Sequence, residues 1–247
     1  MALPMFNEFF LPLDRQFDSG FMSTADAFHE AAKTLDKESK SSGFGMSGSR
    51  LPILYLFRHA IELHFKSILI ILHRRFGPSY PNISREDFPT IAIGSKRKQL
   101  FNVHSIRSLC DGFLALLKKH EPIIKKIGKT DWTDVPDDLN KWVTIIDKAD
   151  RASTMFRYPF TTDSATDNMK SAFKSMHPTA VAAEANARSN DGSPGLMIFA
   201  LKNDKNEIVE TFVRDDDAMS EVHNALKQLA DMLTGVNLGL LCEFVES

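Results

Sequence analysis

The sequence is poor in the residues that form the simplest chemical sites. Its two cysteines, Cys110 and Cys242, lie within apolar helical patterns, which indicates neither a disulfide framework nor a metal knuckle. No HExxH motif, paired-cysteine motif or carboxylate cluster with metal spacing occurs, and Gly43–Phe44–Gly45 lacks the Lys–Ser/Thr pair that follows a phosphate-binding loop. We therefore expect a protein that uses no metal and no cofactor.

Basic residues are absent before Arg15, so we expect no positively charged secretory leader. Residues 51–72 have the length of a membrane span, but the middle of this run carries Arg58, His59, Glu62, His64 and Lys66. Charges at the centre of a bilayer are costly, which favours a helix in a protein core. The remaining composition is that of an ordinary globular protein. We expect a cytoplasmic protein that makes no membrane contact.

Apolar periodicity predicts a mainly α fold, a helical bundle with a small β-hairpin insertion before the C-terminal helix. An irregular arm to Gly20, a Ser/Gly linker (41–49), a long loop (77–103) and a polar insertion (161–195) separate the predicted elements. The predicted helices are 23–37, capped by Ser23–Thr24, then 51–75, 104–120 beginning at His104, 136–152, a short one at 179–188 and a last one at about 217–244; the predicted strands are 196–201 and 207–213.

The helix at 51–75 carries a polar stripe on an otherwise apolar surface. Arg58, His59, Glu62 and Lys66 fall within an arc of about 100°. Glu62 stands four residues from both Arg58 and Lys66, so ion pairs within the helix explain the stripe without any function. Alternatively, Arg58 binds a phosphate and a histidine transfers protons near neutral pH. Arg157 either caps the fourth helix or reaches the stripe.

These residues also carry a resemblance to a known family. Arg58–His59 followed by His64 resembles the R-x(4–6)-H signature of the HEPN superfamily. The wider pattern, an RHxxELxxK helix, a helix that begins at His104 and then Phe156–Arg157–Tyr158–Pro159, looks like a bacterial HEPN-like family over about residues 50–160. The resemblance implies a single HEPN-like helical domain over 1–247, with a core of about 22–160 and 215–245 and an insertion at about 161–214.

Active HEPN proteins are metal-independent endoribonucleases of toxin–antitoxin and antiphage systems, so the resemblance implies attack of a ribose 2′-OH on the adjacent phosphate and a 2′,3′-cyclic end. The implied catalytic residues are Arg58, His59 and His64. The supporting residues would be Glu62, Lys66, His104, Arg157 and Tyr158. On a regular helix His64 lies about 120° from Arg58, so a distorted helix, a second subunit or His59 would have to complete the site. The alternative is a non-catalytic HEPN-like module that binds a nucleotide or a partner and uses the stripe as a polar network.

Charge is distributed unevenly along the chain. Residues 50–129 hold 15 Lys and Arg against five acidic residues, whereas the net charge of the whole chain is −2. Lys96–Arg97–Lys98 is the candidate RNA-binding run; a solvated surface explains the same charges equally well. The predicted partners are RNA, a second copy in a homodimer formed by the final helix or the 51–75 helix, and an antitoxin or defence partner protein.

Overall fold

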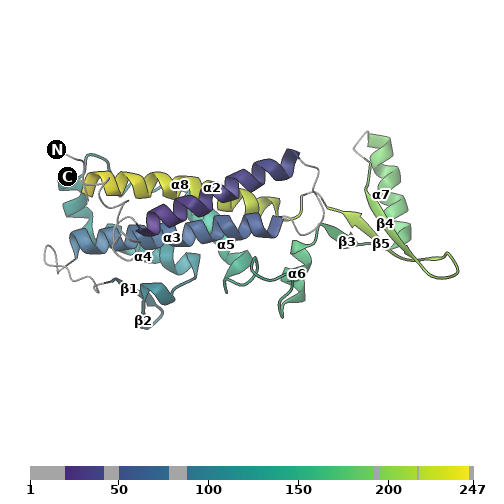
Figure 1. Cartoon of the computed structure of the whole chain (residues 1–247), viewed down its shortest axis with the longest axis horizontal. Helices are drawn as coiled ribbons and strands as arrows, with labels where there is room; N and C mark the ends of the chain where they lie inside the picture. The colour runs from purple at the N-terminus through teal and green to yellow at the C-terminus, as the bar shows by residue number, and fades with distance from the viewer. Residues whose placement is uncertain (1–19, 42–49, 78–87, 192–194, 216, 245–247) are drawn as a thin grey trace.

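The computed structural model describes residues 20–41, 50–77, 88–191, 195–215 and 217–244. The prediction of a mainly helical fold is confirmed. Five long helices form a bundle at one end of the molecule, and a small sheet with one helix forms an arm that projects from the other end (Figure 1). The predicted irregular arm before Gly20 and nearly all of the linker at 41–49 lie outside the described residues.

The bundle is built around one buried helix. Helix α3 (Arg50–Phe76) contacts α2 (Gly20–Ser41), α4 (Ile106–Ile127) and α8 (Ser220–Phe244), while α5 (Asp138–Asp150) packs on α4 and α8. From Phe57 to Leu72 every residue of α3 except His59 is buried, as expected of a helix that is apolar around most of its circumference. The polar stripe of α3 therefore faces protein rather than bulk water.

Helix α8 buries its apolar stripe inside its own chain. Leu226, Leu229, Leu233 and Leu240 are all buried in the shared hydrophobic core, and α8 contacts α2, α3 and α5. The predicted homodimer stays a prediction, but the apolar stripe of α8 is already covered within one chain. The same holds for α3, so neither helix supplies an unburied apolar face for the predicted dimer.

The predicted long loop at 77–103 contains a hairpin. Strands β1 (Thr90–Ile93) and β2 (Lys96–Gln99) pair antiparallel and are followed by the 3₁₀ turn η2 (Leu100–Asn102). Gly94 supplies the positive φ of 60° that the turn requires. Ile91 is buried and packs against Gly112 of α4, so one apolar side chain attaches the hairpin to the bundle.

Helix boundaries differ from the prediction in α2 and α4. The predicted cap at Ser23–Thr24 was wrong, because α2 begins at Gly20 and the Thr24 hydroxyl donates to the Gly20 carbonyl within the helix. His104 precedes α4 instead of beginning it, and the Ser105 hydroxyl caps the helix by accepting from the Ser108 amide. The helix also continues through Pro122 to Ile127. Proline removes one hydrogen bond from the ladder, and here the loss falls at the carbonyl of Lys118, whose side chain is on the exposed face.

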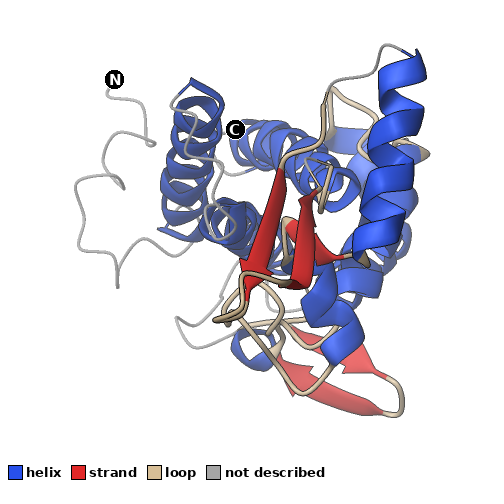
Figure 2. Ribbon diagram, turned by 90° about the vertical axis from the view of Figure 1, so that its right-hand side faces the viewer, coloured by secondary structure: helices blue, strands red, loops and turns tan. Residues whose placement is uncertain are grey.

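Helix α6 (Ser164–Lys170) lies between the bundle and the arm, and the arm holds β3 (Phe173–Ser175), α7 (Pro178–Asp191), β4 (Ile198–Lys202) and β5 (Ile208–Arg214). The predicted hairpin is β4–β5, and β3 adds a third strand that the sequence did not indicate, in the order β3-β5-β4. Figure 2 views the arm from its end. None of the described helices is both long enough and apolar enough to cross a membrane.

Candidate functional site

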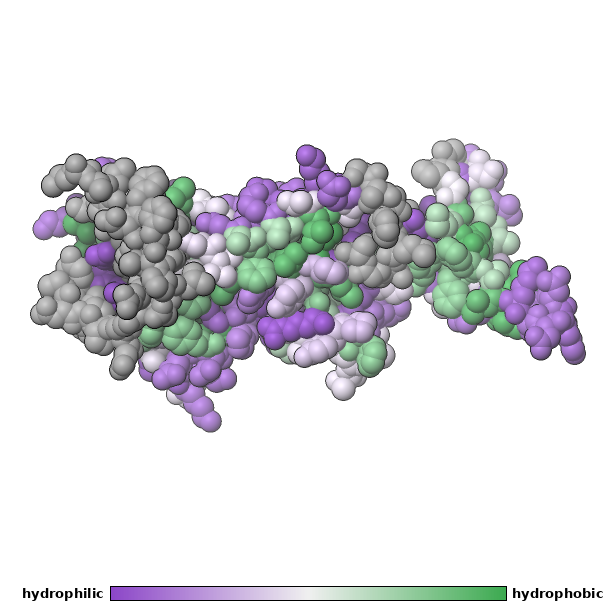
Figure 3. All heavy atoms as spheres, in the orientation of Figure 1, coloured by the Kyte–Doolittle hydropathy of each residue, from purple (hydrophilic) through white to green (hydrophobic). Residues whose placement is uncertain are grey.

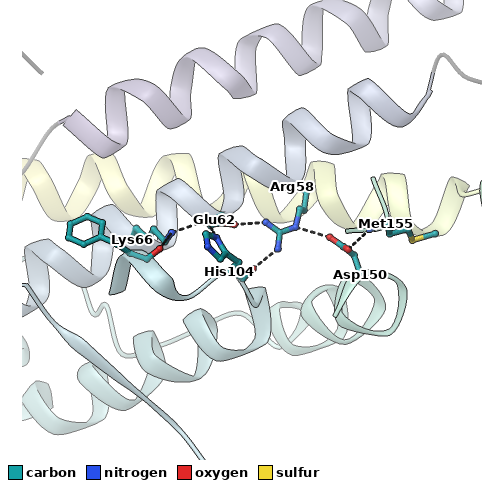
Figure 4. A network of polar contacts seen from close by, with 7 residues as sticks. Arg58, Glu62, Lys66, His104, Asp150 and Met155 are labelled. Atoms are coloured by element: carbon teal, nitrogen blue, oxygen red, sulfur yellow. Dashed lines mark hydrogen bonds and ion pairs between the residues drawn. The ribbon is translucent and has the colours of Figure 1, made fainter. Parts of the chain in front are cut away.

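The stripe on α3 is the centre of a buried network of ions (Figure 4). All three guanidinium nitrogens of Arg58 donate hydrogen bonds. Its Nε lies 2.8 Å from Asp150 Oδ2, one terminal nitrogen lies 2.5 Å from Glu62 Oε2, and the other donates to the His104 carbonyl. The side chain is 1% exposed. Each nitrogen of the Arg58 guanidinium thus has a partner in the same chain.

Glu62 is the shared acceptor of the network. Its Oε1 accepts from Lys66 Nζ at 2.8 Å and lies 2.9 Å from His104 Nδ1. Burial raises the pKa of Glu62, but the hydrogen bond and charge of Lys66, together with Arg58, outweigh burial and lower the pKa to about 2. Two cations and two anions, Arg58, Lys66, Glu62 and Asp150, therefore meet in the interior with no net charge.

The network has one end in the interior and one at the surface. Asp150, at the C-terminal end of α5, also accepts the backbone N–H of Met155 at 2.8 Å, which ties the loop after α5 to Arg58. At the other end the His104 side chain is 52% exposed. His104 is the member of this network that solvent reaches most readily.

His64 points to the opposite side of α3. Its Nε2 lies 3.1 Å from the Thr234 hydroxyl and its Nδ1 accepts from the Asn237 amide at 3.3 Å, both groups belonging to α8. Burial, followed by the nearby His29, lowers the pKa of His64 to about 3. His64 is therefore a neutral histidine in the core. The helical geometry predicted this separation from Arg58, and the two side chains do not meet within one chain.

A second polar cluster surrounds His64 and was not predicted. His29 Nδ1 lies 3.0 Å from the Thr234 hydroxyl, and the Ser67 hydroxyl donates to Asn237 at 3.1 Å. Thr234 and Asn237 stand on the buried face of α8 among leucines. Polar residues at those core positions were the signal in the sequence, since a buried amide needs partners.

His59 is the half-buried histidine of the stripe. Its ring stacks on Tyr55 with centroids 5.7 Å apart and meets the edge of Phe28 at 4.5 Å. Burial lowers its pKa, and among the described residues its Nδ1 has no hydrogen-bond partner. Arg157 lies over the Tyr55 ring, 5.9 Å from its centroid, so it reaches the stripe, one of its two predicted positions.

Two other groups of predicted site residues lie at the surface. The Tyr158 side chain is exposed. Its backbone carbonyl contacts the insertion by accepting a hydrogen bond from Lys170 Nζ at 3.1 Å. Lys96, Arg97 and Lys98 form the exposed strand β2. Arg97 folds back on β1 and donates to the Thr90 hydroxyl at 2.7 Å, whereas the two lysines extend from the hairpin.

Comparison of the chain with family models, curated proteins and solved structures gives no match in any of the three.

Proposed function

We propose that this chain is a non-catalytic HEPN-like module that works by binding a partner, and that its Arg–Glu–Lys stripe is a structural polar network. One observation supports this most: Arg58 is 1% exposed and donates from all three guanidinium nitrogens to its own chain. A guanidinium that is buried in this way and paired with two carboxylates is not accessible to a phosphate. His64, the second residue of the R-x(4–6)-H pattern, packs against α8 on the other side of the helix.

The energetics of the network support the same proposal. To reach a phosphate, Arg58 would have to leave Asp150 and Glu62, two buried carboxylates that it neutralises. Leaving a buried charge without its partner costs roughly 3–5 kcal/mol, which is comparable with a large part of the stability of a domain. The network is better suited to joining α3, α4 and α5 than to exchanging partners with a substrate.

Thermal and urea unfolding of Arg58→Ala tests this function. The substitution leaves Asp150 without its ion pair, so we expect the free energy of unfolding to fall by roughly 3–5 kcal/mol. Arg151→Ala is the matched control. Arg151 is 83% exposed and pairs with Asp147 at 3.4 Å in solvent, so its removal should change stability by less than about 1 kcal/mol.

The same preparations are incubated with single-stranded RNA in EDTA. We expect no cleavage by the native chain and a folded but destabilised Arg58→Ala variant. The proposal would be reversed by two results together. The native chain would cleave RNA and Arg58→Ala would not, while Arg58→Ala would be as stable as Arg151→Ala.

A metal-independent endoribonuclease of the toxin or antiphage type is the second candidate, and His59 is the observation that favours it. His59 has an unbonded Nδ1, a pKa lowered by burial, and Tyr55 and Arg157 beside it. A neutral histidine with an unbonded nitrogen can accept a proton from a ribose 2′-OH. Because this nitrogen is buried, the side chains around His59 would have to move to admit the RNA.

This candidate predicts that native protein generates 2′,3′-cyclic ends and that His59→Ala lowers the cleavage rate about 100-fold or more. His64→Gln is the matched control, because the buried His64 ring lies on the α8 side of α3, away from His59, and its replacement should leave the rate unchanged while the protein stays folded. Equal rates for native protein and His59→Ala would exclude the role of His59.

A further inference from the structure

The arm carries an apolar sheet face that α7 does not cover. Thr211 and Val213 of β5 are buried together with Val181 of α7, so α7 lies on that side of the sheet. Side chains alternate along a strand, which places Phe199 and Phe212 on the other side. These two residues are register partners, and Phe199 meets Phe173 of β3 edge to face with ring centroids 4.9 Å apart.

Strand β4 continues this face to the edge of the sheet. All five of its residues are exposed, and Met197, Phe199 and Leu201 are each about half exposed (50%, 47% and 52%). Figure 3 shows the corresponding apolar surface on the arm, next to a hydrophilic tip. Exposed apolar residues that gather on one surface indicate an interaction site more than the same residues scattered singly would.

The two edges of the sheet differ in whether their backbone groups are occupied. On β3 the outward N–H and C=O of Phe173 both bond the Ser171 hydroxyl, at 3.2 Å and 2.6 Å. Next to β4 the Met197 carbonyl accepts from the Arg214 N–H of β5. Backbone groups point alternately to the two sides of a strand, so this bond shows which residues of β4 point towards β5. Ile198, Ala200 and Lys202 consequently direct their backbone groups outward, where no described strand pairs with β4.

We propose that β4 pairs antiparallel with β4 of a second copy of this chain, about a two-fold axis at Ala200. This register sets Ala200 opposite itself, Ile198 opposite Lys202 of the second copy, and Phe199 opposite Leu201 of the second copy. All three residues with outward backbone groups then face one another, so every outward N–H and C=O of β4 gains a partner. Two three-stranded sheets become one six-stranded sheet.

The composition of β4 favours a second copy over a strand of different sequence. Pairing of a strand with itself sets any central charge against the same charge, which is destabilising. Residues 196–201 are Leu-Met-Ile-Phe-Ala-Leu, without a charge, and Lys202 faces Ile198 in the proposed register. Because opposed residues lie on the same side of a sheet, the Phe199 and Leu201 side chains extend one apolar face across the axis.

The position of the arm leaves room for such a pairing. The arm extends beyond the end of the bundle, and β4 and β5 reach its far tip (Figure 1). The inference rests on the proposed function in one respect: it names a second copy of this chain as the partner that the proposed module binds. The arm variants below leave the Arg58 network intact, so a failure here and a failure of the proposed function give different results.

The test substitutes the residue on the axis. In Ala200→Pro the outward N–H is lost while the bonds to β5 remain, because that N–H does not point to β5. Ala200→Val keeps the N–H and is the matched control. By sedimentation equilibrium at micromolar concentration we expect native protein and Ala200→Val to be dimers, and Ala200→Pro to dissociate with a dissociation constant about tenfold higher or more.

A crosslink tests the register independently of the proline. Ala200→Cys is made with Cys242→Ser, since Cys242 is exposed and Cys110 is buried. Residues paired across such a ladder have Cα atoms about 5.5 Å apart, within reach of a disulfide, so oxidation should yield a covalent dimer. In the same background Lys205→Cys at the exposed tip lies roughly 30 Å from its copy and should not crosslink.

A monomeric native protein, a dimer that Ala200→Pro leaves intact, or equal crosslinking at 200 and 205 would each overturn the proposal. A monomer whose β4 binds a strand of another protein would overturn it as well.

Discussion

At the scale of single residues, α3 buries polar groups on two sides in two different ways. Towards α4 and α5 the groups are ionised and balanced, with Arg58 and Lys66 against Glu62 and Asp150. Towards α8 His64 is neutral and hydrogen-bonded to Thr234 and Asn237, with the Asp26 carboxylate 3.6 Å from its Nε2. Both arrangements satisfy the requirement that buried polar groups have partners. They respond to acid at different pH values.

His64 makes the stability of the fold sensitive to mild acid. Its pKa falls from 6.5 in the unfolded chain to about 3 in the fold, so the unfolded state binds more protons between these values. The stability that His64 contributes is complete above pH 6.5 and is lost as pH falls from 6.5 towards 3. The stability that Glu62 contributes is complete above pH 4.5 and is lost only as pH falls from 4.5 towards 2, because its pKa falls from 4.5 to about 2.

We therefore expect His64→Gln to flatten the pH dependence of unfolding between pH 6.5 and 4.5, by about 1.4 kcal/mol per pH unit. Burial also lowers the pKa values of His29, His59 and His120, so a residual slope should remain. Urea unfolding across this range measures it. His177→Gln, at an exposed histidine of the arm, should give a plot of unfolding free energy against pH that is parallel to that of the native protein. If His64→Gln also gives a parallel plot, the proposed role of His64 fails.

The sequence predicted the local part of the site and not its distant part. Arg58, Glu62 and Lys66 are spaced by four on one helix, so their pairing follows from helix geometry alone. Asp150 completes the network from 92 residues away. A single aspartate at the C-terminal end of a helix, where the helix dipole disfavours a negative charge, does not by itself identify a partner so far away in the sequence.

At the scale of elements, the long helices were predicted well because their apolar repeats are long. The β1–β2 hairpin was missed because β2 is Lys-Arg-Lys-Gln and shows no apolar alternation, although Ile91, Ile93 and Gly94 carried a weak strand–turn signal. Helix α4 was predicted to end before Pro122, yet the exposed carbonyl of Lys118 tolerates the lost bond. Local rules fail where packing or solvent compensates for them.

The edge strands β2 and β4 differ in whether their side chains discourage pairing with another strand. Strand β2 ends its sheet with three cations in four residues, a composition that discourages pairing with another strand. Strand β4 ends the other sheet with four uncharged residues before Lys202. An edge of the second kind stays unpaired only at the risk of aggregation, which supports a cognate partner for β4.

At the scale of the whole molecule, the bundle and the arm differ in how much of their apolar surface they bury. The bundle encloses α3 almost completely, and α8 closes it from the C-terminal end of the chain. The arm has three strands and one helix and leaves Phe199 and Leu201 half exposed. The buried core and the proposed pairing strand β4 therefore lie in separate parts of the molecule, which is why a variant in one part should leave the other intact.

The uneven charge is also a property of the whole molecule. In the fold some of the cations at 50–129 are paired with acidic groups, so fewer of them contribute to a basic surface. Of the 15 cations at 50–129, Arg58 and Lys66 are neutralised in the core, and Lys125 pairs with Glu121 on the surface at 2.8 Å. Lys96 and Lys98 remain exposed on β2. Lys118, Lys119, Lys126 and Lys129, at and after the end of α4, are exposed as well, so the β1–β2 hairpin is one of two basic surfaces that could contact RNA, and it carries the predicted run.

For RNA as a partner we expect weak binding that falls steeply with salt, because each neutralised phosphate releases counterions. Replacing Lys96 and Lys98 by Glu should weaken binding of a single-stranded RNA and reduce the slope of log K against log salt by about 1.4, or about 0.7 for each lost phosphate contact. Lys202→Glu with Lys205→Glu, which removes two exposed cations from the arm, is the matched control and should leave both values unchanged. Fluorescence anisotropy from low to physiological salt makes the measurement, with circular dichroism to verify folding. Equal affinity and slope in all three proteins would show that the lysines of β2 protect a sheet edge and bind no RNA.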